Sequence, residues 1–395
     1  MNVFEDSRVI KTGATRKLNI GGVTKNYDVY AVPLELLFYN DQNDRIATWL
    51  SQYSVEDEFN NDREKYNNRI ENFIEESNPK ALNKTKNNIK AIGQNIPGII
   101  LNDGRIIDGN RRFTCLRQLH RENIYDYGYF EAIILEGGIA NEKQIKILEL
   151  TIQHGEDGKI DYNPIDKLVG LYKDVVLNEL LTIEEYAQST NIKTKDAKKE
   201  LRIALLMAEF LEFIGRPNQF YLAREWDING PLREIDGALQ KEKDEDRKED
   251  IMLVMFTNLL IKPNQDMTRY IRTVKNLVAD SEFGSDYLED QLENTEKVLD
   301  LMNEDDNPDI SYNTVRGNQE LIYTFENSTE LFEEKIKISQ VRNKPLTLLE
   351  DCEKRIKDID IHIIYRLDED EQYEIKEKIK VLQNLLMRMD DEIDV

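Results

Sequence analysis

The sequence predicts an α+β protein, in which an N-terminal domain with a small sheet precedes a mostly helical remainder. Residues 27–32 are rich in Tyr and Val, which is typical of a strand. Residues 96–135 follow a strand–turn–helix–strand pattern. From Glu142 onward one helical pattern follows another. We therefore expect three parts: a domain at 1–160 with a helical insertion at about 40–90, a helical domain at 161–280, and an acidic helical region at 281–395.

The elements of the first domain follow in order along the chain. Residues 1–30 have the pattern of extended segments, joined by a Gly-Gly turn at 21–22. Residues 34–90 are polar with a helical pattern, which predicts the inserted helical segment. The apolar run 130–135 predicts the last strand of the sheet.

Composition excludes several classes of protein. The 395-residue chain is 40% hydrophobic and contains no run of 18 apolar residues, so we expect no membrane span. Its first residues lack the basic and apolar regions of a secretory signal. Cys115 and Cys352 are far apart, which favours a reducing cytoplasm over a disulfide framework or a structural zinc site. The three histidines show no paired spacing for a metal.

The net charge of −24 is unevenly distributed. Residues 1–130 are neutral overall, with 18 basic and 18 acidic side chains, whereas residues 231–395 carry 23 basic and 41 acidic side chains. The acidic part would repel nucleic acid, since binding to duplexes rests on basic side chains that neutralise phosphates. Any contact with DNA must therefore use a local basic patch.

The most informative stretch is residues 104–119. Ile106 and Ile107 predict a short strand that runs into Asp108 and Gly109, and a helix begins directly afterwards. The first turn of that helix offers unpaired N–H groups and the positive end of the helix dipole, beside Arg111 and Arg112. Arginine binds phosphate oxygens bidentately, so the pattern favours a phosphate site. On chemistry alone, a strand–helix turn with solvated or salt-bridged arginines fits equally well.

The sequence Asp-Gly-Asn-Arg-Arg at 108–112, followed by Phe113, Thr114 and Cys115, resembles the Gly-x-Arg-Arg box of the ParB/sulfiredoxin superfamily. Three further stretches resemble elements of that family and occur in the family's order. They are Val32 to Leu34 with Asn43 to Arg45, the strand entry at 91–100, and the Asn-Pro-Ile-Asp stretch within 161–166. The resemblance covers about residues 28–215, roughly half of the chain.

The resemblance implies a nucleoside triphosphate switch, in which occupancy by CTP or ATP with Mg²⁺ controls dimer closure and DNA loading. Carried over residue by residue, Gly109 permits close approach of the backbone, and Arg111 and Arg112 neutralise phosphate oxygens. Asp108, Asn110 and Arg45 complete the nucleotide-binding candidates at this loop. The family's Glu-Asn-x-x-Arg element is not matched in full, and the segment that could replace it is 149–159. Within it, Glu149 is the candidate metal ligand and Gln153 the candidate nucleotide contact. Glu156 and Lys159 are alternative candidates for these roles.

Two enzymatic branches of the family can be tested on the sequence. Sulfiredoxin chemistry needs a cysteine directly after the loop glycine, and this chain has Asn110 there. Cys115 lies further into the helix, on its packed side, so we expect no reductase. A nuclease would need a metal centre, for which Asp103, Asp108 and Glu149 are the available acids. We leave the catalytic residues unassigned.

Residues 182–201 predict a helix-turn-helix. Thr182 and Glu185 form a capping box, Ala187 is the small residue where two helices cross, and Asn191 suits a left-handed turn. The second helix would present the densest basic cluster of the chain, Lys193, Lys195, Lys198 and Lys199. Ordinary αα-hairpins share this spacing and often carry solvated lysines. The position of the unit matches that of the DNA-binding helix-turn-helix in ParB-like proteins, which favours a DNA contact.

The remainder is helical, with a break expected at 229–231 and an exposed helix or mobile linker at 282–310. Residues 346–389 have apolar side chains at spacings of three and four, which predicts a helical hairpin or a short coiled coil around an acidic turn at 368–371. We favour an intramolecular bundle there over a dimer seam.

Two classes of function remain. The first is a nucleotide-gated DNA-binding protein that acts in partition or regulation of DNA, as the resemblance and the lysine cluster favour. The alternative is a ParB-fold NTPase or nuclease of a phage-defence or mobile-element system, whose long acidic C-terminal region docks a protein partner. A degenerate phosphate loop on a helical adaptor is the third interpretation.

Overall fold

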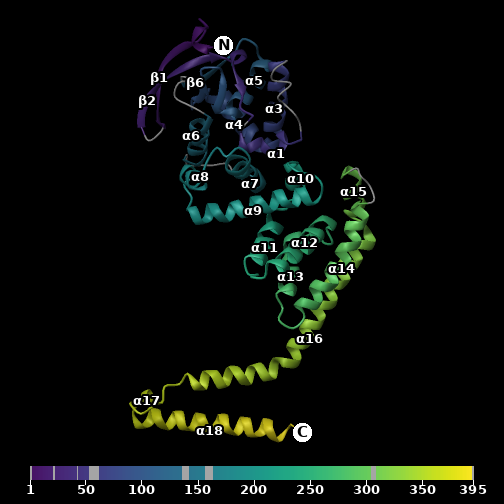
Figure 1. Ribbon diagram of the computed structural model, residues 1–395. Helices are drawn as coiled ribbons and strands as arrows, with labels where there is room; N and C mark the ends of the chain where they lie inside the picture. The colour runs from purple at the N-terminus through teal and green to yellow at the C-terminus, as the bar shows by residue number, and fades with distance from the viewer. Residues whose placement is uncertain are drawn as a thin grey trace. The chain divides into compact units, whose positions relative to one another are not determined.

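The computed structural model describes residues 2–20, 23–41, 43–52, 62–135, 142–155, 163–303 and 308–393. It confirms the α+β class: a six-stranded mixed sheet near the N-terminus precedes a mostly helical remainder (Figure 1). The chain forms two compact units, Met1–Thr329 and Glu330–Val395. Among the described residues, no helix combines the length and the apolar character that crossing a membrane requires.

The sheet is mixed. Its strands are β1 (Ile10–Ile20), β2 (Val23–Pro33), β3 (Phe38–Tyr39), β4 (Gly98–Leu101), β5 (Arg105–Asp108) and β6 (Tyr129–Leu135), in the spatial order β1-β2-β6-β4-β5-β3. The β1/β2, β2/β6 and β4/β5 pairs are antiparallel, whereas β4/β6 and β3/β5 are parallel. Ile20 pairs with Val23, so β1 and β2 are adjacent antiparallel strands, whereas residues 21–22, where the Gly-Gly turn is expected, lie outside the described residues.

Helices cover both faces of the sheet. One face packs against α3 (Arg63–Ser77), α4 (Pro79–Ile92) and α5 (Asn110–Glu122), through a core that includes Phe73, Phe113 and Phe130. The other face packs against α6 (Glu142–Gly155), where Ile145 and Leu148 contact apolar side chains of β4, β5 and β6. The predicted helical insertion thus forms part of the core, and burial of its apolar side chains holds it on the sheet.

Ion pairs add specificity where α3 meets α5. The Arg117 Nε donates to Glu71 Oε2 over 2.9 Å, and both side chains are buried. Glu64 and Arg121 extend the network, with Glu64 on Arg117 and Arg121 on Glu71. A buried arginine needs such partners because an unpaired buried charge is strongly destabilising.

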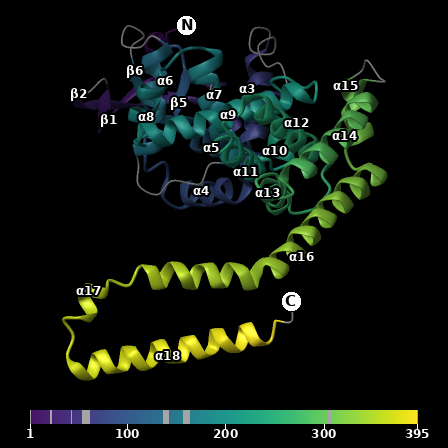
Figure 2. The ribbon, with the colours of Figure 1, turned by 60° about the horizontal axis from the view of Figure 1, so that its bottom comes forward.

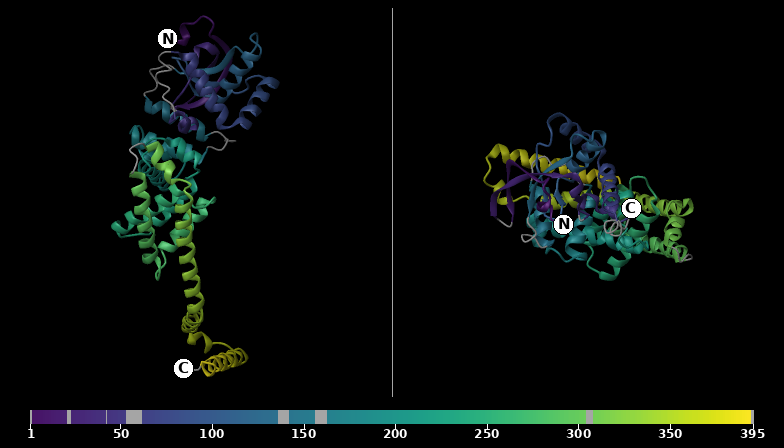
Figure 3. Two further views of the ribbon diagram at one scale, coloured as in Figure 1. Left: turned by 90° about the vertical axis from the view of Figure 1, so that its right-hand side faces the viewer. Right: turned by 90° about the horizontal axis from the view of Figure 1, so that it is seen from above.

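Helices make up the rest of the first unit (Figures 2 and 3). Short helical turns lie at η1 (Val3–Glu5), η2 (Leu34–Leu36), η3 (Asp44–Ile46) and α1 (Ala47–Leu50). After α6 come α7 (Pro164–Tyr172), the π-helical turn η4 (Lys173–Leu177), α8 (Ile183–Ser189), α9 (Thr194–Phe213), α10 (Phe220–Glu225), α11 (Asn229–Leu239), α12 (Glu245–Ile261), α13 (Met267–Val278), α14 (Gly284–Asn303) and α15 (Pro308–Val315). Pro164 lies in the first turn of α7, which Asn163 caps.

Two expectations for this region are wrong. Residues 229–231 do not interrupt the helical structure but begin α11; the interruption lies just before them, after the end of α10 at Glu225. Residues 282–310 include α14, which is neither an exposed helix nor a linker, because its inner face is buried. That face is mixed: Tyr287, Leu288 and Val298 are buried on it together with polar residues. Gln291 accepts a hydrogen bond from Asn258 and donates one to Ser328, each over 2.9 Å. Interhelical hydrogen bonds thus interrupt the apolar stripe by which a packed helix is usually identified.

The second unit is helical. It contains the C-terminal part of α16 (Gln319–Lys357), the short α17 (Ile361–Ile364) and α18 (Glu369–Asp391), and α18 turns back along the last part of α16 (Figures 1 and 2). The acidic run 368–371 begins α18 instead of forming the turn, since Asp368 and Glu371 make a capping box. The expected intramolecular bundle is not seen, because no residue of α17 or α18 is buried in the part of the chain that the structure describes.

Candidate functional site

The turn between β5 and α5 is built around Gly109. Its φ of 105° is left-handed, and an added Cβ would lie 2.8 Å from the ring of Phe130 and 3.1 Å from Arg112. Glycine is therefore required here for its conformation and for close packing. Because Gly109 is the N-cap of α5 and has no side chain, it cannot cap the first N–H groups of the helix. These groups and the helix dipole make the turn attractive to an anion.

Two arginines anchor this turn to the loop before β4. The Arg112 Nη2 donates to Asp108 Oδ2 over 2.8 Å, and its Nη1 donates to the backbone oxygen of Ile96 over 2.7 Å. Arg16 reaches the same carboxylate over 3.4 Å and the backbone oxygen of Pro97 over 2.5 Å. Asp108 is thus shared by two guanidinium groups, which leaves a net positive charge beside the helix N-terminus.

The two residues between Gly109 and Arg112 differ in environment. Asn110 is 8% exposed, and within the described residues its Oδ1 accepts no hydrogen bond. An unsatisfied buried amide oxygen costs free energy and calls for a donor from elsewhere. Arg111 is partly exposed, beside Asn110 in the first turn of α5.

Parallel pairing of β3 and β5 brings a second loop to this edge of the sheet. Phe38 pairs with Arg105 and Tyr39 with Ile106, so the chain leaves both strands at the same edge. Tyr39 also contacts α5 directly: its hydroxyl hydrogen-bonds Thr114 Oγ1 over 2.8 Å. The structure therefore places the Asn43-Asp44-Arg45 segment at the edge that holds Gly109, although the side chain of Arg45 lies outside what it describes.

Asp44 connects this edge to a buried ionic cluster on α6. The Lys146 Nζ donates to Asp44 Oδ1 over 2.6 Å and lies 3.3 Å from Asp174 Oδ2, which comes from η4. Glu149, one turn after Lys146, is 1% exposed and accepts a hydrogen bond from Gln153 over 2.9 Å. Lys146 thus lies among three buried carboxyl groups, and Lys173 is a second basic group near Asp44 and Asp174.

The pKa values of the cluster are shifted mainly by burial, and the charges of its members act beside it. Burial raises the pKa of Glu149 and of Asp174 well above the ordinary carboxyl value; Lys146 opposes this shift, and the neighbouring carboxyls add to it. Burial acts to lower the pKa of Lys146, but Asp44, Glu149 and Asp174 together raise it. Lys146 is therefore charged, whereas Glu149 and Asp174 readily take up protons.

The metal-ligand candidates are not assembled into one centre. Asp103 precedes β5 and Asp108 ends it, so the strand separates them, and Asp103 accepts a hydrogen bond from the Arg105 backbone over 2.9 Å. Glu149 lies in the Lys146 cluster. Glu156 and Lys159 lie outside the described residues, and among those described no group of three acidic, His or Cys side chains is arranged to hold a metal ion. The thiol of Cys115 is buried, which raises its pKa to about 12 and keeps it unreactive.

The predicted helix-turn-helix geometry is present in α8 and α9. The Thr182–Glu185 capping box forms, Asn191 is left-handed with φ 55°, and Ala187 and Ala197 are buried where the helices meet. Lys193 is the N-cap of α9, and Lys193, Lys195, Lys198 and Lys199 are all exposed. Lys198 lies 3.2 Å from Glu184 in an exposed ion pair, which contributes little to stability.

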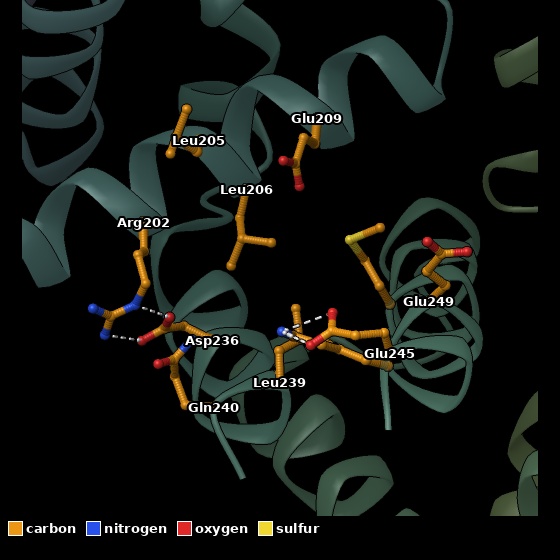
Figure 4. A pocket seen from close by; sticks show the side chains of 11 residues that line it. Arg202, Leu205, Leu206, Glu209, Asp236, Leu239, Gln240, Glu245 and Glu249 are labelled. Atoms are coloured by element: carbon orange, nitrogen blue, oxygen red, sulfur yellow. Dashed lines mark hydrogen bonds and ion pairs between the residues drawn. The ribbon is translucent and has the colours of Figure 1, made fainter. Parts of the chain in front are cut away.

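A hollow of about 280 Å³ lies between α9, α11 and α12 (Figure 4). Leu205, Leu206, Leu239 and Met252 give it an apolar lining, and Glu209, Glu245 and Glu249 make its rim acidic. Burial raises the pKa of Glu209, and Glu212 adds to the shift. Arg202 and Lys248 also line the hollow and pair with Asp236 and Glu245, and none of the residues that the sequence analysis selected lies in it.

Sequence reasoning missed Arg16, Lys146 and Asp174. Arg16 lies 92 residues from Asp108 in the chain, and only the β1–β2 hairpin carries it to the turn. Lys146 and Asp174 belong to different helices, so no local spacing links them. The one available signal was a lysine and a glutamate three apart within an apolar helix, at positions 146 and 149.

A comparison with protein-family models gives no match, and a comparison with curated protein sequences gives no significant match either.

Proposed function

We propose that the chain binds a nucleoside triphosphate, CTP or ATP, at the turn formed by Gly109, Asn110, Arg111 and Arg112. The observation that carries the proposal is the uncapped N-terminus of α5, flanked by arginines and by the unsatisfied Oδ1 of Asn110. Phosphate oxygens suit the helix N–H groups and the guanidinium groups. An amino group of the ligand is the kind of donor that Asn110 Oδ1 lacks.

The resemblance to the ParB/sulfiredoxin superfamily supports the same assignment. Arg45 and Gln153 are the candidates for the family's further contact elements: Arg45 follows Asp44 in the chain, and Gln153 lies on α6, whose Lys146 donates to Asp44. Glu149 does not fit a Mg²⁺ ligand, because its cluster already holds the Lys146 ammonium group. Mg²⁺ would then be held mainly by the nucleotide phosphates and water, as is common for this ion.

We expect one nucleotide to raise the melting temperature of the chain, because a ligand of the native state stabilises it by mass action. The measurement is a thermal-shift series with CTP, ATP, GTP and UTP in the presence of Mg²⁺, on the wild type and on Arg111→Ala/Arg112→Ala. The double variant should lose the shift.

The matched control is Arg272→Ala/Arg342→Ala, which removes two exposed arginines of other helices, α13 and α16, and should keep the shift. Absence of a shift in the wild type with all four nucleotides at millimolar concentration would contradict the proposal. Release of phosphate in the same samples would identify the alternative, an NTPase.

We further propose that the exposed lysines of α9 contact DNA when nucleotide is bound. Lys198→Glu/Lys199→Glu should weaken binding to a fluorescent duplex about tenfold or more and reduce its salt dependence, since phosphate contacts release counterions. Fluorescence anisotropy over a salt series, with and without the nucleotide, measures both quantities.

Lys241→Glu/Lys243→Glu is the matched control, because it makes the same charge change at two exposed lysines just after α11. Equal losses in both variants would show that only net charge matters, and α9 would then not be a DNA-reading helix.

A further inference from the structure

Helix α18 exposes an apolar face. None of its described residues is buried, although many of them are large and apolar. Ile379 is 47% exposed, Leu382 42% and Leu386 49%. Apolar faces of this size on a soluble chain usually mark an interaction surface.

The exposed apolar residues follow a heptad. Spacings of four and three alternate without interruption along one stripe: the half-buried Ile375 and the exposed Ile379, Leu382, Leu386, Met389 and Ile393. Tyr373, Val381, Leu385 and Met387 are exposed apolar residues beside this stripe. All but Ile393, which follows the helix end, lie within α18. In heptad terms Ile379 and Leu386 take position a, and Leu382 and Met389 take position d. A strict heptad of this kind is the seam of a coiled coil, which requires a partner helix.

We propose that this partner is α18 of a second copy of the chain, in antiparallel orientation and centred level with Asn384. In that register, residues equally far from Asn384 lie at the same height. Ile379 then faces Met389 of the other copy, Leu382 faces Leu386, and Ile375 faces Ile393. Every position of the stripe is paired with an apolar residue, with none left over.

The charges beside the seam select this arrangement. In an antiparallel pair, e positions face e positions and g positions face g positions. Lys376 at e then faces Asp390 at e, and Lys378 at g faces Glu392 at g, so that two-fold symmetry gives four attractive pairs. Charges at e and g positions set the partner and orientation of coiled coils.

A parallel pair of α18 helices has no such complementarity. There, each g position faces the e position five residues later in the partner, which pairs Lys378 with Gln383 and Leu385 with Asp390. Packing on α16 of the same chain is the other arrangement, but no residue of α18 is buried despite its short connection to α16, and only Gln372, Ile375 and Glu377 are partly covered. The charge pattern therefore favours the antiparallel dimer, independently of the proposed nucleotide function.

The test is sedimentation velocity of the full chain over a range of concentrations. We expect a dimer for the wild type. Lys376→Glu/Lys378→Glu and Asp390→Lys/Glu392→Lys should each raise the dimer dissociation constant on the order of 100-fold, because four attractive pairs become repulsive. An equimolar mixture of the two variants should dimerise like the wild type, since all four pairs are again attractive.

Matched controls place the same charge changes on the outer face of α18, as Lys380→Glu/Arg388→Glu and Glu374→Lys/Glu377→Lys, and should leave the dimer intact. Leu382→Asp/Leu386→Asp should abolish it, while circular dichroism checks that the chain remains folded. A monomeric wild type, charge variants that dimerise normally, or a mixture that stays monomeric would each overturn the proposal. So would a Leu382→Asp/Leu386→Asp variant that remains dimeric.

Discussion

Replacing Lys146 by methionine is expected to lower the free energy of unfolding of the first unit by about 3 to 5 kcal/mol at pH 8, the usual result of removing one partner from a buried ion pair. Lys146 is 3% exposed and is the ammonium group of a cluster with Asp44, Asp174 and Glu149. Methionine keeps the length of the side chain and removes the charge, so the carboxyl groups lose their counter-ion.

The free energy of unfolding that Lys146→Met loses should depend on pH. Because folding raises the pKa values of Glu149 and Asp174, the folded state binds protons more tightly than the unfolded chain does. The stabilisation from protonation is complete below the ordinary carboxyl pKa and disappears as pH rises through the raised values. Without Lys146 these pKa values rise further, so Lys146→Met should be nearly tolerated at pH 5 and strongly destabilised at pH 8.

Thermal melting of Lys146→Met at both pH values measures the effect. Lys146→Met/Glu149→Gln should recover part of the loss at pH 8, since one carboxylate no longer needs to be neutralised. Lys241→Met, at an exposed lysine, is the control and should melt like the wild type. Equal losses at pH 5 and pH 8 would show that the cluster is not held by charge.

Gly98→Ala is expected to destabilise the sheet domain by about 2 to 3 kcal/mol, at the upper end of the range for overpacking a core. An added Cβ would overlap the ring of Phe130 and lie 2.8 Å from the backbone oxygen of Asp108. Phe130 is fully buried and stacks edge-to-face on Phe113, so its ring cannot move aside. The strain falls on the contact between β4 and β5 that positions Asp108.

Chemical denaturation of Gly98→Ala provides the free energy of unfolding. Gly237→Ala is the matched control, because this glycine lies within α11 with its nearest neighbour, Lys275 Nζ, at 3.7 Å. It should be neutral or stabilise the helix by up to about 1 kcal/mol. A Gly98→Ala variant as stable as the wild type would mean that Phe130 has an alternative rotamer.

Local chemistry made much of the candidate site predictable. Gly109 before two arginines and a helical apolar pattern predicts the turn at the N-terminus of α5, because conformational freedom and periodicity are properties of adjacent residues. Thr182, Glu185 and Asn191 predict the paired helices α8 and α9 for the same reason.

Long-range contacts were not predictable in this way. Arg16 joins the site only through the pairing of β1 with β2 and of β2 with β6, and Asp174 joins the Lys146 cluster only because α7 and η4 pack beside α6. Helix α14 was expected to be an exposed helix or a mobile linker, because Gln291, Asn294 and Thr295 interrupt its apolar stripe and are buried through hydrogen bonds and close packing. Sequence patterns report local preference, whereas these contacts depend on the assembled core.

The depth of Lys146 also decides how the molecule responds to ionic strength. Mobile ions screen exposed charges beyond about 8 Å at physiological salt, but they screen buried pairs far less. The Lys146 pairs should therefore persist in concentrated salt, whereas the lysines of α9 and of α18, all exposed, lose most of their attraction to partners. High salt should thus weaken the contacts that the exposed lysines make with other molecules, while the buried ion pairs that stabilise the fold remain.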